Sequence, residues 1–337
     1  MPRCFRRRCY SLAAVIAGAL LSGGARSEQE TQPAGLLLAF ASYRVHPGFP
    51  RLYYYRHDGL AQGKVTQGPP TPTDRSDFDP HLTPDGRLLA FNYEVTGKVA
   101  RAMLWDVAGA RALPLPEPPP AAIDMGPSVS ADGKRLVVST LYRPGPSGWN
   151  LAVSDADGKP LDLPGLNSDD DDRMPSLSAD GRRLAFASSR PGGAGLQDLF
   201  LYDLQERRLT PLPGLNSPSR ETEPSLSADG RWLAFVSTRP QRAGAPAGSG
   251  NLDVYLYDTT AKALVALPGL NGPGPDQSPA LSPDGRFIAF VSERISGEGG
   301  RDVYLYDRKA ARLVSTPGLN SPRDDADPAL AYLLPDE

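Results

Sequence analysis

The chain has 337 residues, a length that fits one large domain or two to three ordinary ones. Its 34 Gly and 36 Pro exceed the usual share and exclude a helical bundle or coiled coil, whereas 40% apolar residues allow a sizeable core. With 36 basic and 39 acidic residues the formal net charge is −3, so no nucleic-acid partner is suggested. We therefore expect an all-β protein with many turns.

Residues 1–27 have the pattern of a secretory signal peptide. Four arginines between positions 3 and 8 precede an apolar run, Ser11 to Leu21, and small residues precede a cleavage position ahead of Glu28. The run is shorter than the ~20 residues that cross a bilayer, although an uncleaved anchor is the alternative. We expect a periplasmic or secreted protein without a membrane span after cleavage. Cleavage would also remove both cysteines, Cys4 and Cys9.

The rest of the chain is a repeat. Its starting segment, DPHLTPDGRLLAF in the first copy, recurs with changes, and the sixth copy is short. The copies begin at Asp79, Gly126, Met174, Glu223, Ser278 and Asp327. The prolines that follow these residues are 47, 48, 49, 55 and 49 positions apart. A period near 50 is typical of a propeller blade of four strands.

Each copy predicts four strands, which we take in chain order from the third copy. A short alternating segment from Pro175 to Ser178 precedes an Asp-Gly hairpin turn. Leu184–Ala187 is a continuous apolar run, which predicts a strand buried on both faces between neighbouring blades. Asp198–Asp203 is rich in aromatic and branched residues, as strands are. Arg208–Pro213 contains prolines, which favours the outermost, edge strand.

The two ends of the repeat complete each other. Leu36 to Arg44 matches the second strand of a copy, and Leu52–Arg56 and Lys64–Gln67 match the third and fourth, but no first strand precedes them. Asp327–Tyr332 is a first strand with no second strand after it. Joined, they form one blade and close the ring, which removes the exposed strand edges that the two ends of the repeat would otherwise have. We predict one domain over 34–335, a six-bladed β-propeller of four-stranded antiparallel blades, and a monomer.

The repeat P-x-L-S-x-D-G-R-x-[LI]-A-F, followed by D-[VL]-[YF]-L-Y-D, resembles the TolB-like propeller family with its WD40-like PD40 repeats. The resemblance covers nearly the whole chain after the signal peptide. It implies an exported binding protein without catalytic activity, whose protein partner docks at the mouth of the propeller channel. The family's namesake has an α/β domain before its propeller, whereas only Glu28 to Gly35 separates the predicted signal from the first strand here.

An acidic residue occurs three positions before each repeat proline, at the start of the predicted innermost strand. We call these residues the blade acids: Asp77, Asp124, Asp172, Glu221, Asp276 and Asp325. Arginines end the second strand at the same face in five copies, and we call these the blade arginines: Arg44, Arg143, Arg190, Arg239 and Arg294. Both sets are expected to ring one mouth of the channel. They are our candidate binding residues.

Two interpretations of the blade acids stay open. They can be structural, capping a turn or pairing with an arginine, or they can form a site for a cation or a cationic partner. Calcium is a candidate because Asn167, Asn216, Asn271 and Asn320 precede four of the acids and supply suitable oxygens. Otherwise we predict no cofactor and no metal site. The run Asp169–Asp172 lacks EF-hand spacing, and Pro240–Gly250 is a long small-residue loop on the same face.

The sequence supplies little for an enzyme. Its three histidines, His46, His57 and His81, are scattered, and no G-x-S-x-G motif occurs. We assign no catalytic residue. We expect a non-catalytic binding or scaffolding propeller whose partner is an envelope protein or a glycan. The alternative is a small propeller hydrolase or lyase that uses carboxylates at the channel mouth.

Overall fold

The structure is a computed structural model that describes residues 35–58, 63–72, 75–95, 99–115, 122–142, 148–155, 157–240 and 251–333. The predicted signal peptide, Arg143 and positions 241–250 of the long loop lie outside these residues. Within the described part of the chain there is no helix long and apolar enough to cross a membrane.

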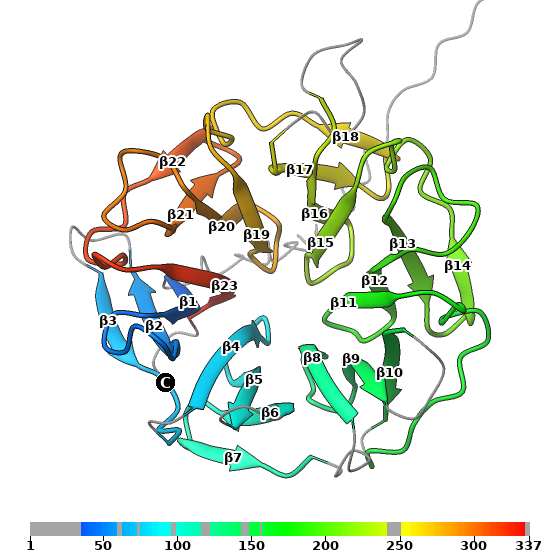
Figure 1. The fold of residues 1–337 in the computed structure, drawn as a ribbon, viewed down its shortest axis with the longest axis horizontal. Helices are drawn as coiled ribbons and strands as arrows, with labels where there is room; N and C mark the ends of the chain where they lie inside the picture. Colours follow the sequence, from blue (N-terminus) through cyan, green and yellow to red (C-terminus); the bar gives the residue numbers. More distant parts are fainter. Residues whose placement is uncertain are drawn as a thin grey trace, which may run out of the picture. The chain divides into compact units, whose positions relative to one another are not determined.

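Six antiparallel sheets form a ring of blades, each with its first strand nearest the centre (Figure 1). Blade 1 contains β23 (Asp325–Tyr332), β1 (Leu36–Ser42), β2 (Arg51–His57) and β3 (Lys64–Gln67). Blade 2 contains β4 (Arg75–Leu82), β5 (Leu88–Val95), β6 (Val99–Asp106) and β7 (Arg111–Leu113). Blade 3 contains β8 (Ala122–Val129), β9 (Leu136–Tyr142) and β10 (Asn150–Ser154).

The other three blades follow the same order. Blade 4 contains β11 (Asp172–Leu177), β12 (Arg183–Ser188), β13 (Asp198–Asp203) and β14 (Arg208–Thr210). Blade 5 contains β15 (Glu221–Leu226), β16 (Trp232–Ser237), β17 (Asp253–Asp258) and β18 (Ala263–Val265). Blade 6 contains β19 (Asp276–Leu281), β20 (Phe287–Ser292), β21 (Asp302–Asp307) and β22 (Arg312–Val314). The predicted six-bladed propeller is therefore confirmed.

Blade 1 is composed of both ends of the repeat, as predicted. The C-terminal strand β23 pairs antiparallel with β1, so that Leu36 lies opposite Tyr332 and Ser42 opposite Asp325. On its other side β1 pairs with β2, and β2 pairs with β3. Because the last strand hydrogen-bonds to the first, the ring is closed by a backbone ladder rather than by side chains alone.

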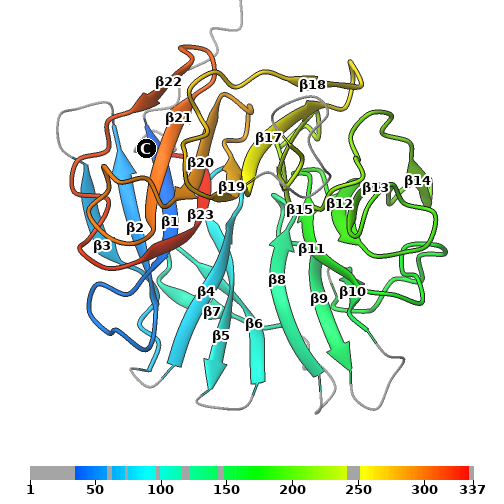
Figure 2. The same cartoon turned by 45° about the horizontal axis from the view of Figure 1, so that its top comes forward.

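The second strands are buried on both faces because a neighbouring blade packs against each face. In blade 4, Leu184 and Phe186 contact blade 3, while Ala185 and Ala187 of the same strand pack against Leu233 of blade 5. All five of these side chains have 0% exposure. Strands of adjacent blades therefore run beside each other between the two faces of the ring, as the tilted view shows (Figure 2).

Tyrosines of the third strands bind each blade to the turn that connects it with the blade before it. The hydroxyls of Tyr202, Tyr257 and Tyr306 donate hydrogen bonds to the carbonyl oxygens of Pro164, Pro213 and Pro268, at 2.9, 2.8 and 2.8 Å. Each acceptor lies in a P-G-L-N turn that leads to the next inner strand. A buried tyrosine hydroxyl thus finds a partner and sets the spacing of adjacent blades.

The fourth strands differ from the prediction. In blade 4 the expected strand Arg208–Pro213 ends at Thr210, so Pro211 and Pro213 follow the strand instead of lying in it. Proline has no N–H to donate to the ladder, and the strand stops where the prolines begin. In blade 3 the described residues form three strands, with an isolated bridge between Ser154 and Pro160 on the outer side of β10.

Candidate functional site

The blade acids lie at the beginning of the inner strands, and all six are buried. In four blades the acid forms an ion pair with the blade arginine of its own sheet. These pairs are Asp172–Arg190 at 2.8 Å, Glu221–Arg239 at 3.1 Å, Asp276–Arg294 at 2.9 Å and Asp325–Arg44 at 3.1 Å. The four acidic side chains are 0% exposed, and the arginine side chains are 11–17% exposed.

Each pair belongs to a hydrogen-bonded unit, which blade 4 illustrates. Asp172 accepts hydrogen bonds from the N–H and the hydroxyl of Ser168 at 2.6 and 2.9 Å, which caps the turn before the strand. Arg190 donates to the carbonyl of Leu166 at 2.6 Å, and its guanidinium stacks over Phe186 and Phe200 at 5.1 and 4.7 Å from the ring centroids. Acid, arginine and aromatic rings therefore hold the P-G-L-N turn on its own blade.

In blades 2 and 3 the blade acid pairs with an arginine of the preceding blade instead. Asp77 is 3.3 Å from Arg51 of β2, and Asp124 is 3.9 Å from Arg101 of β6. The blade acids and the described blade arginines are thus brought together within the ring wall. Contact of these residues with a partner stays a prediction.

The asparagines of the P-G-L-N turns bond to the third strands. Asn216 accepts from the N–H of Leu199 at 2.9 Å and donates to its carbonyl at 3.0 Å, as a neighbouring strand would. Asn271 makes the same two contacts with Val254. Within the described ranges no group of three or more His, Cys, Asp or Glu side chains is arranged to hold a metal ion. Calcium binding stays a prediction.

The centre of the ring contains a cavity of about 400 Å³, lined by residues from all six inner strands. The residue immediately before each repeat proline lines this cavity: Asp79, Gly126, Met174, Glu223, Ser278 and Asp327. All six have left-handed backbones, with φ between 49° and 57°. The ladder register shifts at the same point of every inner strand, for example between Arg173 and Ser176. These bulges form the channel lining.

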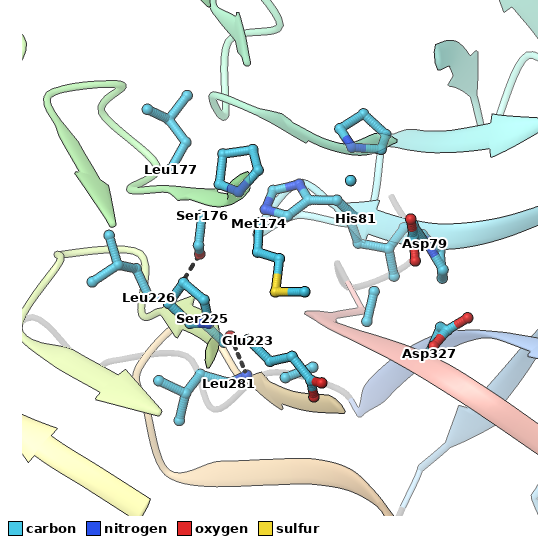
Figure 3. Close-up of a pocket in the computed structure, with 18 of the residues that line it drawn as sticks. Asp79, His81, Met174, Ser176, Leu177, Glu223, Ser225, Leu226, Leu281 and Asp327 are labelled. Atoms are coloured by element: carbon cyan, nitrogen blue, oxygen red, sulfur yellow. Dashed lines mark hydrogen bonds between the residues drawn. The ribbon is translucent and has the colours of Figure 1, made fainter. Parts of the chain in front are cut away.

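Three of the lining residues are acidic, and we call them the channel carboxylates: Asp79, Glu223 and Asp327. They lie around one open space, with Met174 beside them (Figure 3). Glu223 accepts the N–H of Ser278 in the next blade at 2.7 Å. Asp327 accepts the N–H of Asp79, again across to the next blade, whereas the N–H of Gly126 donates to Asn92 Oδ1 at 2.7 Å. Glu223 and Asp327 therefore each satisfy one backbone N–H of the following bulge.

Burial has a strong effect on these groups. Burial, reinforced by the charge of Asp327, raises the pKa of Asp79 to about 7. Burial likewise raises the pKa of Asp327 and that of Glu223. Near neutral pH the Asp79–Asp327 pair therefore retains a proton that separated aspartates would release.

His81 lines the same channel, in the position that three other copies fill with serine and two with alanine. The hydroxyls of Ser128, Ser176 and Ser225 accept the N–H of Leu177, Leu226 and Leu281 in the next blade at 2.9, 2.9 and 3.0 Å. His81 Nδ1 accepts the N–H of Val129 at 3.4 Å, and Nε2 lies 3.1 Å from Ser128 Oγ. Burial lowers the pKa of His81 to about 4, so the ring is neutral and joins two blades.

The remaining cavity wall is mostly apolar. Met125, Met174 and Trp149 line it together with leucines and prolines of the inner strands. Arg173 lies near the rim, 5.9 Å from the Trp149 ring centroid and ion-paired with Asp171. A concave, mostly apolar space with a few convergent polar groups is the usual form of a ligand site, and volumes of roughly 300–1,000 Å³ are typical.

Sequence reasoning selected the residue three positions before each proline and missed the one directly before it. A signal for the second position is present, because it is acidic in three copies and Gly, Met or Ser in the others. The position that is acidic in every copy supplies the ion pairs of the ring wall. A position that varies among otherwise similar copies gives a channel its particular chemistry.

Neither protein-family models nor curated protein sequences match the chain. Solved structures do. TolB from Acinetobacter baumannii superposes with a TM-score of 0.60 and 19% identity, over 88% of this chain and 66% of that protein. A putative TolB from Agrobacterium tumefaciens superposes with a TM-score of 0.56 and 17% identity, over 89% of this chain and 98% of that protein. An oligogalacturonate lyase in complex with manganese superposes with a TM-score of 0.53 and 18% identity, over 82% of this chain and 73% of that protein.

These likenesses establish the fold, which is the six-bladed propeller of the TolB proteins, as the repeat motif indicated. The chain spans just under two thirds of the A. baumannii protein. At these identities a shared fold carries no activity, substrate or partner with it.

Proposed function

We propose that the chain is an exported, non-catalytic binding propeller that meets an envelope protein or glycan at the mouth of its channel and takes part of that partner into the cavity. The observation that carries the proposal is the cavity of about 400 Å³, whose lining differs from blade to blade in an otherwise repeating ring. The predicted signal peptide and the TolB-like fold support a periplasmic location.

The test is capture of partners from an envelope extract by the immobilised full-length protein. Met125 lines the cavity, so Met125→Trp is designed to fill it without changing charge. Leu264→Trp adds the same bulk on β18, where Leu264 is 43% exposed, and serves as the matched control. We expect Met125→Trp to lose the captured partner and Leu264→Trp to retain it. Equal capture by both variants and the wild type would contradict channel binding.

One observation favours an enzyme as the second candidate. The Asp79–Asp327 pair combines a carboxylic acid with a carboxylate near neutral pH, which is the requirement for general acid–base chemistry in a hydrolase or lyase. One superposed propeller is an oligogalacturonate lyase, so acidic oligosaccharides are a reasonable first substrate to assay. Turnover that Asp79→Asn abolishes, in a variant with unchanged melting temperature, would favour this candidate.

A further inference from the structure

The channel carboxylates differ from the blade acids in how their charge is compensated. Every blade acid has an arginine nitrogen within 3.9 Å. Within the described part of the chain, none of the ion pairs involves Asp79, Glu223 or Asp327. The ring thus pairs the acids in its wall with arginines and leaves those in its channel without an ion-pair partner among the described residues.

The arginines around the channel do not supply that cation. Arg173, which lines the cavity, is itself ion-paired with Asp171. Arg220 and Arg301 stabilise the charges of Glu223 and Asp327 from a distance. Arg301 itself is paired with Asp324 at 3.0 Å, and Arg220 donates to Gln197 at 2.8 Å. The backbone N–H groups that reach the channel carboxylates are neutral donors. They satisfy hydrogen bonds, but they do not cancel the net negative charge enclosed by the cavity.

An enclosed negative charge is neutralised by a proton or by a cation that enters. The raised pKa of Asp79 shows that the proton is bound more tightly than by an ordinary aspartate. A cation would compete with that proton for the same carboxylates, so the two forms of the cavity are linked by pH.

The shape and walls of the cavity select among cations. A volume of about 400 Å³ far exceeds a single metal ion, and the described side chains offer no cluster of metal ligands. Met125, Met174 and Trp149 suit an apolar chain or an aromatic-stacked cation rather than a hydrated ion. The features fit a ligand with one positive end and an apolar stem.

We infer that the cavity binds an alkylammonium or guanidinium group between Asp79, Glu223 and Asp327, with the attached chain along the apolar wall. The inference deepens the proposed function and rests on it. The same chemistry comes from two sources, a free polyamine or a Lys or Arg side chain of an inserted partner segment.

Binding is tested by calorimetric titration of the full-length protein at pH 8 with spermidine, with a short peptide containing one lysine, and with the same peptide containing norleucine. We expect spermidine, the lysine peptide or both to bind, and the norleucine peptide to fail. Spermidine alone would identify a free polyamine as the source, and the peptide alone an inserted side chain. Failure of both, or equal heats with calcium chloride, would overturn the inference.

The variant for this test is Glu223→Gln with Asp327→Asn, because both replacements keep an oxygen for the N–H of Ser278 and of Asp79. We expect affinity to fall about tenfold or more, since each lost charge removes a charge-assisted hydrogen bond. The matched control is Glu206→Gln, an exposed acid on the turn after β13, which should bind like the wild type. Undiminished affinity in the double variant would overturn the inference.

A readout independent of the variants is the effect of pH on the wild type. Lowering the pH from 8 to 5 should weaken binding, because protons occupy the carboxylates. Affinity that stays constant over this range would contradict a carboxylate site. If the wild type captures an envelope partner but neither spermidine nor the lysine peptide binds, this inference fails and the proposed function stands. If no partner is captured but the probes bind, only the proposed function fails.

Discussion

The guanidinium of Arg44 lies 3.1 Å from the carboxylate of Asp325, although 281 positions separate the two residues in the chain. Arg44 follows β1, and Asp325 begins β23, so the pair fastens the C-terminal strand to the first one. It repeats in blade 1 the contact that Arg190 and Asp172 make in blade 4. The closing blade is therefore assembled from the same parts as the continuous ones.

Replacement of Arg44 by alanine should destabilise the fold because Asp325 would remain buried without its cation. We expect the free energy of unfolding to fall by about 3 kcal/mol, measured by urea denaturation. Arg208→Ala is the control, since its pair with Glu206 is exposed and worth less than about 1 kcal/mol. Equal losses in the two variants would show that Arg44 has no special role in closure.

The tyrosine contacts between blades give a second prediction. Tyr257→Phe removes the hydrogen bond to Pro213 and leaves that carbonyl without its donor, so we expect a loss of about 1 kcal/mol in unfolding free energy. Tyr54→Phe is the control, because its buried hydroxyl has no hydrogen-bond partner among the described residues. The control should be neutral or slightly stabilising. A result with the order reversed would rule out the inter-blade bond as a source of stability.

His81 should limit stability in acid. Its folded-state pKa lies near 4, below the ordinary value of 6.5, so the unfolded chain binds a proton at higher pH than the folded one. Stability from this group is therefore lost as pH falls from about 6.5 to about 4. His81→Ser introduces the serine that three other copies use to accept the next blade's N–H, and should remove this loss. Thermal melts of the wild type and the variants at pH 4.5 and 7 test this prediction. His81→Ala serves as the variant that cannot accept the N–H of Val129.

Asp79 should change the pH dependence of stability in the opposite direction from His81. Its folded-state pKa of about 7 exceeds the ordinary value of 3.8, so the folded state holds a proton that the unfolded chain has released. The contribution to stability is complete below about pH 4 and is lost as pH rises to about 7. Asp79→Asn should flatten this part of the profile. His81 changes stability in the reverse sense over an overlapping pH range. The melting temperatures of Asp79→Asn and His81→Ser are therefore compared with each other at each pH.

The fold was predictable because the same pattern of strands and turns recurs along the chain. Repeated Asp-Gly turns and apolar second strands defined the blades, and the unmatched segments at Leu36 and Asp327 predicted the composite one. The channel lining was not predictable, since it depends on a bulge. Simple alternation through Arg173, Met174 and Pro175 does not anticipate a left-handed Met174 that lines the cavity beside both neighbours. Repetition predicts the scaffold, whereas side-chain direction at a bulge needs coordinates.

The antiparallel pairing of β1 with β23 determines how the ring would respond to mechanical tension. Leu36 begins β1 and lies opposite Tyr332, the last residue of β23, so a pull on the two chain ends is applied to the same end of the ladder. The hydrogen bonds between these strands would then be loaded one after another, as in unzipping, rather than all at once in shear. Blade 1 is therefore the blade that a stretching force would open first.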